Sequence, residues 1–201
     1  MTLVTKPAPD FTTSAVLHND TIIENFNLYK TIHNKKCILF FWPMDFTFVC
    51  PSEIIAFNQL YSEFLKRDTE IIGVSCDSVF VHYAWRQTSI KKGGIGNIQY
   101  TIVSDIKREI QKIYEIEHPS IGVALRASFL IDKNKIIRHQ VINDLPFGRN
   151  INELLRMIDA VQFNDIHGEV CPAQWTQGKD AIKPSPNGIL DYCSKNRDYS
   201  K

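Results

Sequence analysis

A run of apolar side chains from Cys37 to Trp42, followed by a short loop and then a helix pattern, is the feature that most constrains the fold. Residues 37–42 carry no polar side chain, which is typical of a strand buried on both faces of a sheet. From Pro51 to Lys66 the apolar side chains recur at helical spacing, so we expect an amphipathic helix there. A buried strand that leads into such a helix indicates a layered α/β domain.

Further strands and helices alternate along the rest of the chain. Apolar runs predict strands at 71–76, 99–103, 129–131 and 136–142, and helical spacing predicts helices at 79–91, 106–114 and 151–163. Residues 132–135 have the composition of a hairpin turn between the last two strands. This order predicts an α/β fold with a mixed central sheet flanked by helices.

Composition divides the chain into a core domain and a tail. The chain has 201 residues, of which 44% are apolar, enough to bury one core. After Asn164, glycine and proline become frequent, which breaks any regular element. We therefore expect one domain over residues 1–164 and an extended arm over residues 165–201.

Charge and hydropathy patterns exclude several classes of partner. The formal net charge is +1 with no run of basic residues, so nothing indicates a nucleic-acid partner. No apolar stretch approaches membrane-spanning length. The first residues, Met1–Pro7, lack the hydrophobic region of a signal peptide, so we expect a cytoplasmic location. The five cysteines are an odd number without framework spacing, which argues against a disulfide scaffold.

Cys50 is the candidate reactive residue. It lies after an aromatic-rich loop and at the predicted helix start, where Pro51 suits the first turn and Glu53 favours it electrostatically. Unpaired N–H groups at a helix start favour the thiolate, which is the nucleophilic form of cysteine. From the residues alone, a cysteine that merely fills the core is the alternative.

The spacing of Pro43, Thr47 and Cys50 resembles the active-site loop of peroxiredoxins, thiol peroxidases that reduce hydroperoxides with a cysteine. The chain is similar to their typical two-cysteine subgroup, which includes bacterial alkyl hydroperoxide reductase subunits. This resemblance implies a thioredoxin-like fold with a C-terminal arm. It extends in register over nearly the whole chain, through Asp77-Ser78, Trp85, Gly93-Gly94-Ile95-Gly96, Arg126, Asn143-Asp144-Leu145-Pro146, Gly148-Arg149 and His167-Gly168-Glu169-Val170-Cys171-Pro172.

The resemblance also implies the roles of single residues. Cys50 would be oxidised to a sulfenic acid, Thr47 and Arg126 would hold its sulfur and the peroxide, and Pro43 would shield it. The matching glutamate and second arginine of a supporting ion network are Glu53 and Arg149. Considered singly, the threonine could be a turn residue, the two arginines could be solvated surface charges, and the glutamate could serve only the helix start. We also expect an aromatic collar around the cysteine, formed by Phe40, Trp42, Phe46 and Phe48.

Cys171 matches the resolving cysteine of the family, which forms an intersubunit disulfide with the sulfenic acid of the partner. The alternative is an exposed tail cysteine without a function. Cys37 and Cys76 lie within apolar strands and are expected to be small buried side chains. Cys193 stands where many family members carry the phenylalanine of a Tyr-Phe pair that is associated, together with the Gly-Gly-x-Gly loop, with sensitivity to overoxidation, so that sensitivity is an open question here.

The partners implied by the resemblance are a hydroperoxide substrate and an external dithiol, either thioredoxin or a dedicated disulfide reductase. The family forms homodimers that often assemble into decamers, and in this chain the strand at 136–142 would be the dimer edge. No metal, haem or flavin is implied, and neither is a nucleic acid or a membrane.

Other chemistries fit these residues less well. A thioredoxin-type oxidoreductase needs Cys-x-x-Cys, which the chain lacks. A zinc site from His167, Cys171 and Cys50 lacks paired ligand spacing, and no histidine lies in a recognisable hydrolase motif. An oligomeric chaperone or redox-signalling role stays open as an addition to peroxidase activity.

Overall fold

The computed structural model describes residues 2–195 of the chain. These residues form two compact units, with the boundary between Ile151 and Asn152. The predicted division after residue 164 stays a prediction. Residues 196–201 of the predicted arm, and Met1 of the predicted start, lie outside the described residues.

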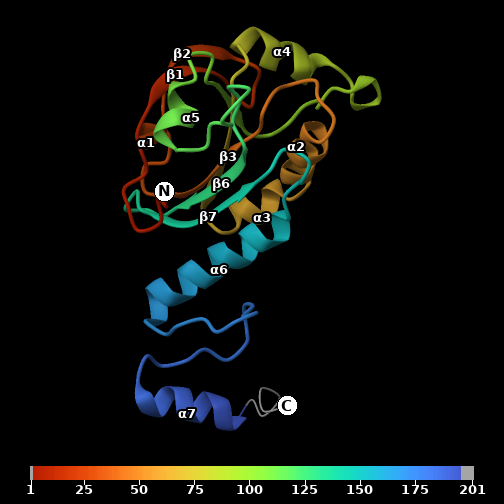
Figure 1. Ribbon diagram of the computed structural model, residues 1–201. Coiled ribbons are helices and arrows are strands. Elements are labelled where there is room, and N and C mark those ends of the chain that lie inside the picture. Colours follow the sequence, from red (N-terminus) through yellow and green to blue (C-terminus); the bar gives the residue numbers. More distant parts are fainter. Residues whose placement is uncertain (1, 196–201) are drawn as a thin grey trace. The chain divides into compact units, whose positions relative to one another are not determined.

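The first unit is built on a seven-stranded sheet in the order β2-β1-β5-β4-β3-β6-β7 (Figure 1). The pairs β3–β4 and β4–β5 are parallel and the other neighbouring pairs are antiparallel. This mixed sheet confirms the predicted fold class. The strands are β1 (Thr12–Val16), β2 (Ile22–Asn27), β3 (Lys36–Phe41), β4 (Thr69–Ser75), β5 (Thr101–Ser104), β6 (Arg126–Ile131) and β7 (Ile137–Asn143).

Strand β3 shows how the sheet is covered on both faces. All of its residues are buried, as its uninterrupted apolar run predicts. Because successive side chains point to opposite faces, Phe40 stacks on Phe57 at 4.2 Å between ring centroids, whereas Phe41 contacts Tyr114 at 5.4 Å. Phe57 belongs to α2 (Cys50–Gln59), and Tyr114 directly follows α5 (Glu109–Ile113). Helices therefore cover the two faces of the sheet from opposite sides (Figure 1).

In the first unit, three of the expected helices are shorter than their sequence patterns predict. The helix expected from Pro51 to Lys66 is divided into α2 and α3 (Tyr61–Leu65), because Leu60 between them has φ −100° and ψ 9°. The helix expected at 106–114 begins only after Arg108, whose φ of +58° is left-handed. The helix expected at 79–91 ends at Gln87, as α4 (Val79–Gln87), and a 3-10 turn follows at Ile90–Lys92. A further short helix, α1, spans Leu28–Thr31.

The second unit holds two helices joined by an irregular segment. Helix α6 (Ile151–His167) begins at the unit boundary, and α7 (Pro186–Lys195) closes the described part of the chain. Between them, Val170 and Ile182 form an isolated antiparallel bridge with two hydrogen bonds of 2.9 Å. Cys171 follows directly after this bridge. None of the helices in residues 2–195 is long and apolar enough to cross a membrane.

Candidate active site

Cys50 is the first residue of α2, after the loop that leaves β3, and it is completely buried. Val49, the residue before the helix, makes no side-chain capping contact, and Pro51 lies in the first turn. The sulfur is therefore placed at the N-terminal end of the helix, where the helix dipole favours negative charge. This confirms the predicted position of the cysteine.

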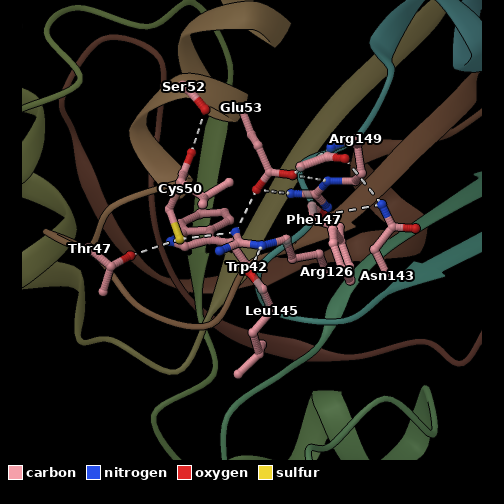
Figure 2. A network of polar contacts seen from close by, with 12 residues as sticks. Trp42, Thr47, Cys50, Ser52, Glu53, Arg126, Asn143, Leu145, Phe147 and Arg149 are labelled. Carbon is pink, nitrogen blue, oxygen red and sulfur yellow. Dashed lines mark hydrogen bonds and ion pairs between the residues drawn. The ribbon is translucent and has the colours of Figure 1, made fainter.

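Two side chains have donor atoms within hydrogen-bond distance of this sulfur (Figure 2). Thr47 Oγ1 lies 2.9 Å from Cys50 Sγ, and Arg126 Nη1 lies 3.2 Å from it. The same Thr47 hydroxyl lies 2.9 Å from the main-chain oxygen of Met44. A hydroxyl has one proton, so it donates to the carbonyl while the sulfur is a thiol and can turn to the sulfur when a thiolate forms. The predicted partners Thr47 and Arg126 thus meet at Cys50.

Arg126 is held in place by two acceptors besides the sulfur. Its Nε donates to the main-chain oxygen of Leu145 at 2.7 Å, and its Nη1 donates to Glu53 Oε2 at 2.7 Å. The side chain is only 4% exposed, so this ion pair is shielded from water. Arg126 is therefore not a solvated surface charge: it is fixed at the site at the start of β6.

Arg149 holds the other side of the same carboxylate. Its Nε lies 2.8 Å from Glu53 Oε1, its Nη2 lies 2.9 Å from Oε2, and its main-chain N–H also donates to Oε1 at 3.1 Å. The guanidinium lies over the ring of Phe40, 5.1 Å from the centroid. Burial lowers the pKa of Arg149, and the adjacent Glu53 opposes that shift. Figure 2 shows Glu53 between the two guanidinium groups.

The four groups form a buried set of charges that balances in only one state. Arg126 and Arg149 are positive and Glu53 is negative, which leaves one positive charge in excess while Cys50 is a thiol. A thiolate at Cys50 brings the sum to zero. An unbalanced charge is costly in a buried site, so the arrangement supports a negatively charged sulfur and negative charge that develops beside it.

Only part of the predicted aromatic collar is buried, together with Pro43. Pro43 is buried at the end of β3, and its carbonyl accepts a hydrogen bond from the thiol of Cys76 at 3.3 Å. Trp42 is also buried, whereas Phe46 is half exposed and Phe48 is 99% exposed. The prediction for Phe48 is therefore wrong: an aromatic residue in a loop carries no positional signal that says whether it faces inward.

A buried polar network that the sequence does not predict holds the loop before Cys50. Asp45 accepts hydrogen bonds from Trp42 Nε1 at 2.9 Å, and its other oxygen lies 2.7 Å from Nδ1 of His82 on α4. Its main-chain N–H donates to Asp77 at 2.8 Å. Burial raises the pKa of Asp45, and His82 opposes that shift. A polar residue in an otherwise apolar segment is the only available signal, and it does not reveal the partner.

Cys171 belongs to the second unit, and its relation to Cys50 stays a prediction. Its thiol is partly buried and lies 3.7 Å from the main-chain oxygen of Ala160 on α6. Burial raises the pKa of Cys171, and Arg156 opposes that shift. All five cysteines are free thiols, and Cys37 is buried, as expected. The prediction for Cys76 is wrong, because this residue lies one position beyond the end of β4 and is only partly buried. Cys193 is exposed on α7.

The described residues hold no group of three or more histidine, cysteine or acidic side chains that could bind a metal ion. The polar side chains gathered at Cys50 are hydrogen-bond donors and an ion network. Such a set is suited to stabilising anionic sulfur and oxygen.

Comparisons with known proteins agree with this chemistry. Residues 4–140 match the AhpC/TSA family, and residues 160–195 match the C-terminal domain of 1-Cys peroxiredoxin. The chain is 64% identical over 195 residues to alkyl hydroperoxide reductase C of Buchnera aphidicola subsp. Baizongia pistaciae, covering 97% of this chain and 98% of the relative. It is 49% identical to alkyl hydroperoxide reductase C of Helicobacter pylori strain 26695, covering 96% and 98%.

A solved structure is similar over almost the same length. The reduced 2-Cys peroxiredoxin of Plasmodium vivax superposes with a TM-score of 0.93 at 45% identity, covering 96% of this chain and 100% of that one. The resemblance inferred from the residues thus extends to both the sequence and the fold.

Proposed function

The chain belongs to the AhpC/TSA family of peroxidases, and on that premise we propose that it reduces hydrogen peroxide and organic hydroperoxides by a two-cysteine cycle. The observation that carries the proposal is the convergence of Thr47 Oγ1 and Arg126 Nη1 on Cys50 Sγ, at 2.9 Å and 3.2 Å. Two donors at a buried sulfur at a helix start suit a nucleophile whose reaction generates negative charge.

In the first step the Cys50 thiolate attacks one peroxide oxygen. A sulfur–oxygen bond forms, the oxygen–oxygen bond breaks, and the departing alkoxide or hydroxide takes a proton to leave as alcohol or water. Cys50 becomes a sulfenic acid, oxidised by two electrons. Arg126 and Thr47 donate to the oxygens as charge shifts onto them, while Glu53 and Arg149 keep the Arg126 guanidinium aimed at the sulfur, and Pro43 limits access to it.

In the second step the thiolate of Cys171 from a second copy of the chain attacks the sulfenic sulfur. The disulfide forms as the sulfur–oxygen bond breaks, and the hydroxide leaves as water after taking a proton. An external dithiol, from thioredoxin or a dedicated disulfide reductase, then reduces the disulfide by exchange. The proposal includes a cytoplasmic location, where the external dithiol is kept reduced.

The second copy pairs along β7 in this proposal, as the sequence resemblance implies. Strand β7 is the last in the sheet order. At Ile137 its outer edge exchanges backbone hydrogen bonds with Thr5 and Lys6, and within the described residues no further strand of the sheet pairs with that edge. An open edge can pair with another strand. Assembly of such dimers into decamers belongs to the same proposal.

The proposal is tested by steady-state peroxide consumption with a dithiol reductant. Cys50→Ser is expected to lose all activity, because no other cysteine has the donors that surround this sulfur. Cys171→Ser is expected to form the sulfenic acid but not the disulfide. Peroxide turnover that survives in Cys50→Ser would contradict the proposal.

A further inference from the structure

Arg156, on α6 of the second unit, joins the helix to the segment that carries Cys171. Its Nη1 donates to the main-chain oxygen of Trp175 at 2.9 Å. Its Nε and Nη2 form a fork on Glu153, at 2.6 Å and 2.7 Å from the two carboxylate oxygens. The guanidinium is therefore oriented on one side by the carboxylate and on the other by the backbone four residues beyond Cys171.

The Cys171 segment is fastened to α6 on both sides of the cysteine. Before it, Asn164 Nδ2 donates to the main-chain oxygen of Glu169 at 2.9 Å. Beyond it, the buried ring of Trp175 lies 5.0 Å from the ring of Phe163, in addition to the contact with Arg156. Cys171 itself contacts the main-chain oxygen of Ala160, one helical turn after Arg156. The cysteine is thus held along the helix face to which Arg156 belongs.

Burial and the nearby charge of Arg156 act on the pKa of Cys171 in opposite directions. Burial raises the pKa of Cys171, and a thiol that donates to a carbonyl is further stabilised in its protonated form. Arg156 acts in the opposite direction by favouring the thiolate. Glu153 raises the pKa of Arg156 through its hydrogen bonds. A negative charge paired with a guanidinium reduces the field that the guanidinium exerts on a third group.

We propose that Arg156 is a positioning residue for the resolving step, which holds the Cys171 segment on α6 and supplies the positive charge that favours its thiolate, while Glu153 tempers that charge. The proposal rests on the resolving role of Cys171 in the proposed function. The arginine touches neither peroxide nor sulfenic acid and changes no bond in the reaction. It acts through the sulfur that attacks.

Neutralising Arg156 and neutralising Glu153 are expected to change the thiolate fraction of Cys171 in opposite directions. Arg156→Gln removes the charge that favours the thiolate, whereas Glu153→Gln removes the charge that opposes it. A purely structural ion pair would be broken by either change, and both variants would then shift resolution in the same direction. Arg156→Lys is the matched control, since it keeps the charge and loses the fork.

The first measurement is the pH profile of iodoacetamide labelling at Cys171, followed by mass spectrometry in a Cys50→Ser background. The midpoint is expected to move to higher pH in Arg156→Gln, to lower pH in Glu153→Gln, and to stay near that of the parent in Arg156→Lys. The Arg156 side chain is 27% exposed and that of Glu153 is 40% exposed, so solvent screens both. The expected change in labelling rate at pH 7 is therefore modest, roughly two- to fivefold.

The second measurement, in chains that retain Cys50, is the rate of disulfide formation after one equivalent of hydrogen peroxide. Samples are quenched with N-ethylmaleimide and separated on non-reducing gels. At pH 7 we expect slower formation in Arg156→Gln and faster formation in Glu153→Gln, with the oxidation rate of Cys50 unchanged. Far-UV circular dichroism checks that each variant is folded. If Arg156→Gln is unfolded, Glu153→Gln still tests the predicted direction, which is faster disulfide formation.

The results distinguish a failure of the role of Arg156 from a failure of the resolving role of Cys171. If the parent forms the Cys50–Cys171 disulfide but the two glutamine variants shift in the same direction or not at all, the role of Arg156 is refuted and the proposed function stands. If the parent forms no such disulfide, the resolving role of Cys171 fails and the role of Arg156 fails with it.

Discussion

Replacing Arg126 with methionine is expected to slow the reaction of Cys50 with peroxide by about 10²–10³-fold, the usual cost of losing one preorganised donor to a developing anion. The substitution removes the 3.2 Å contact with Cys50 Sγ and keeps the length of the side chain. Glu53 keeps its fork with Arg149, so the fold should survive. One positive charge leaves the buried set, which then carries an excess negative charge whenever the thiolate forms.

The assay is the second-order rate constant for Cys50 oxidation, followed by stopped-flow tryptophan fluorescence or by competition with horseradish peroxidase. Arg126→Lys should fall between the parent and Arg126→Met, because one ammonium can serve either Glu53 or the sulfur but lacks the planar fork. Arg67→Met is a matched control: this arginine lies just after α3, its side chain is 21% exposed and it pairs with Glu63. A rate for Arg126→Met within twofold of the control would refute the role of Arg126 as a donor.

Three further predictions follow from the same contacts. Thr47→Val should reduce the peroxide rate by about 10- to 100-fold, as expected for a lost hydrogen bond to a charged group, while Thr47→Ser keeps most of it. Glu53→Gln should lower the free energy of unfolding by about 3–5 kcal/mol in urea titrations, since it leaves two buried guanidinium groups without their carboxylate; a loss below 1 kcal/mol would contradict this. Burial raises the pKa of Cys76 from 9.0 to about 11. The unfolded chain therefore releases this proton first, and between pH 9 and pH 11 the parent should lose stability relative to Cys76→Ala; parallel stability profiles would contradict the shift.

Residues near Cys50 in the chain could be placed from the sequence because the spacing determines their contacts. A strand that ends at Phe41 and a helix that begins at Cys50 leave a short loop, so Thr47 lies near the sulfur. Arg126 and Arg149 are different. Their distance from Cys50 depends on the order of strands in the sheet, with β6 beside β3, and only the resemblance to a family pointed to them.

The differences from prediction have local physical causes. Apolar residues keep their helical spacing on both sides of Leu60 and of Arg108. The pattern therefore cannot show that the backbone leaves the helical conformation at these two residues. Strands β1 and β2 were missed because their residues are largely polar and partly exposed. The contact of His82 with Asp45 joins α4 to the active-site loop, and no spacing rule connects two such residues.

The pairing of Cys50 with Cys171 is the central claim that most needs a direct measurement. We would treat the parent, Cys50→Ser and Cys171→Ser with one equivalent of hydrogen peroxide, block the remaining thiols, and separate the products on a non-reducing denaturing gel. The account predicts a covalent dimer in the parent that is absent from both variants and disappears with dithiothreitol. A parent that stays monomeric after Cys50 is oxidised would contradict intersubunit resolution by Cys171.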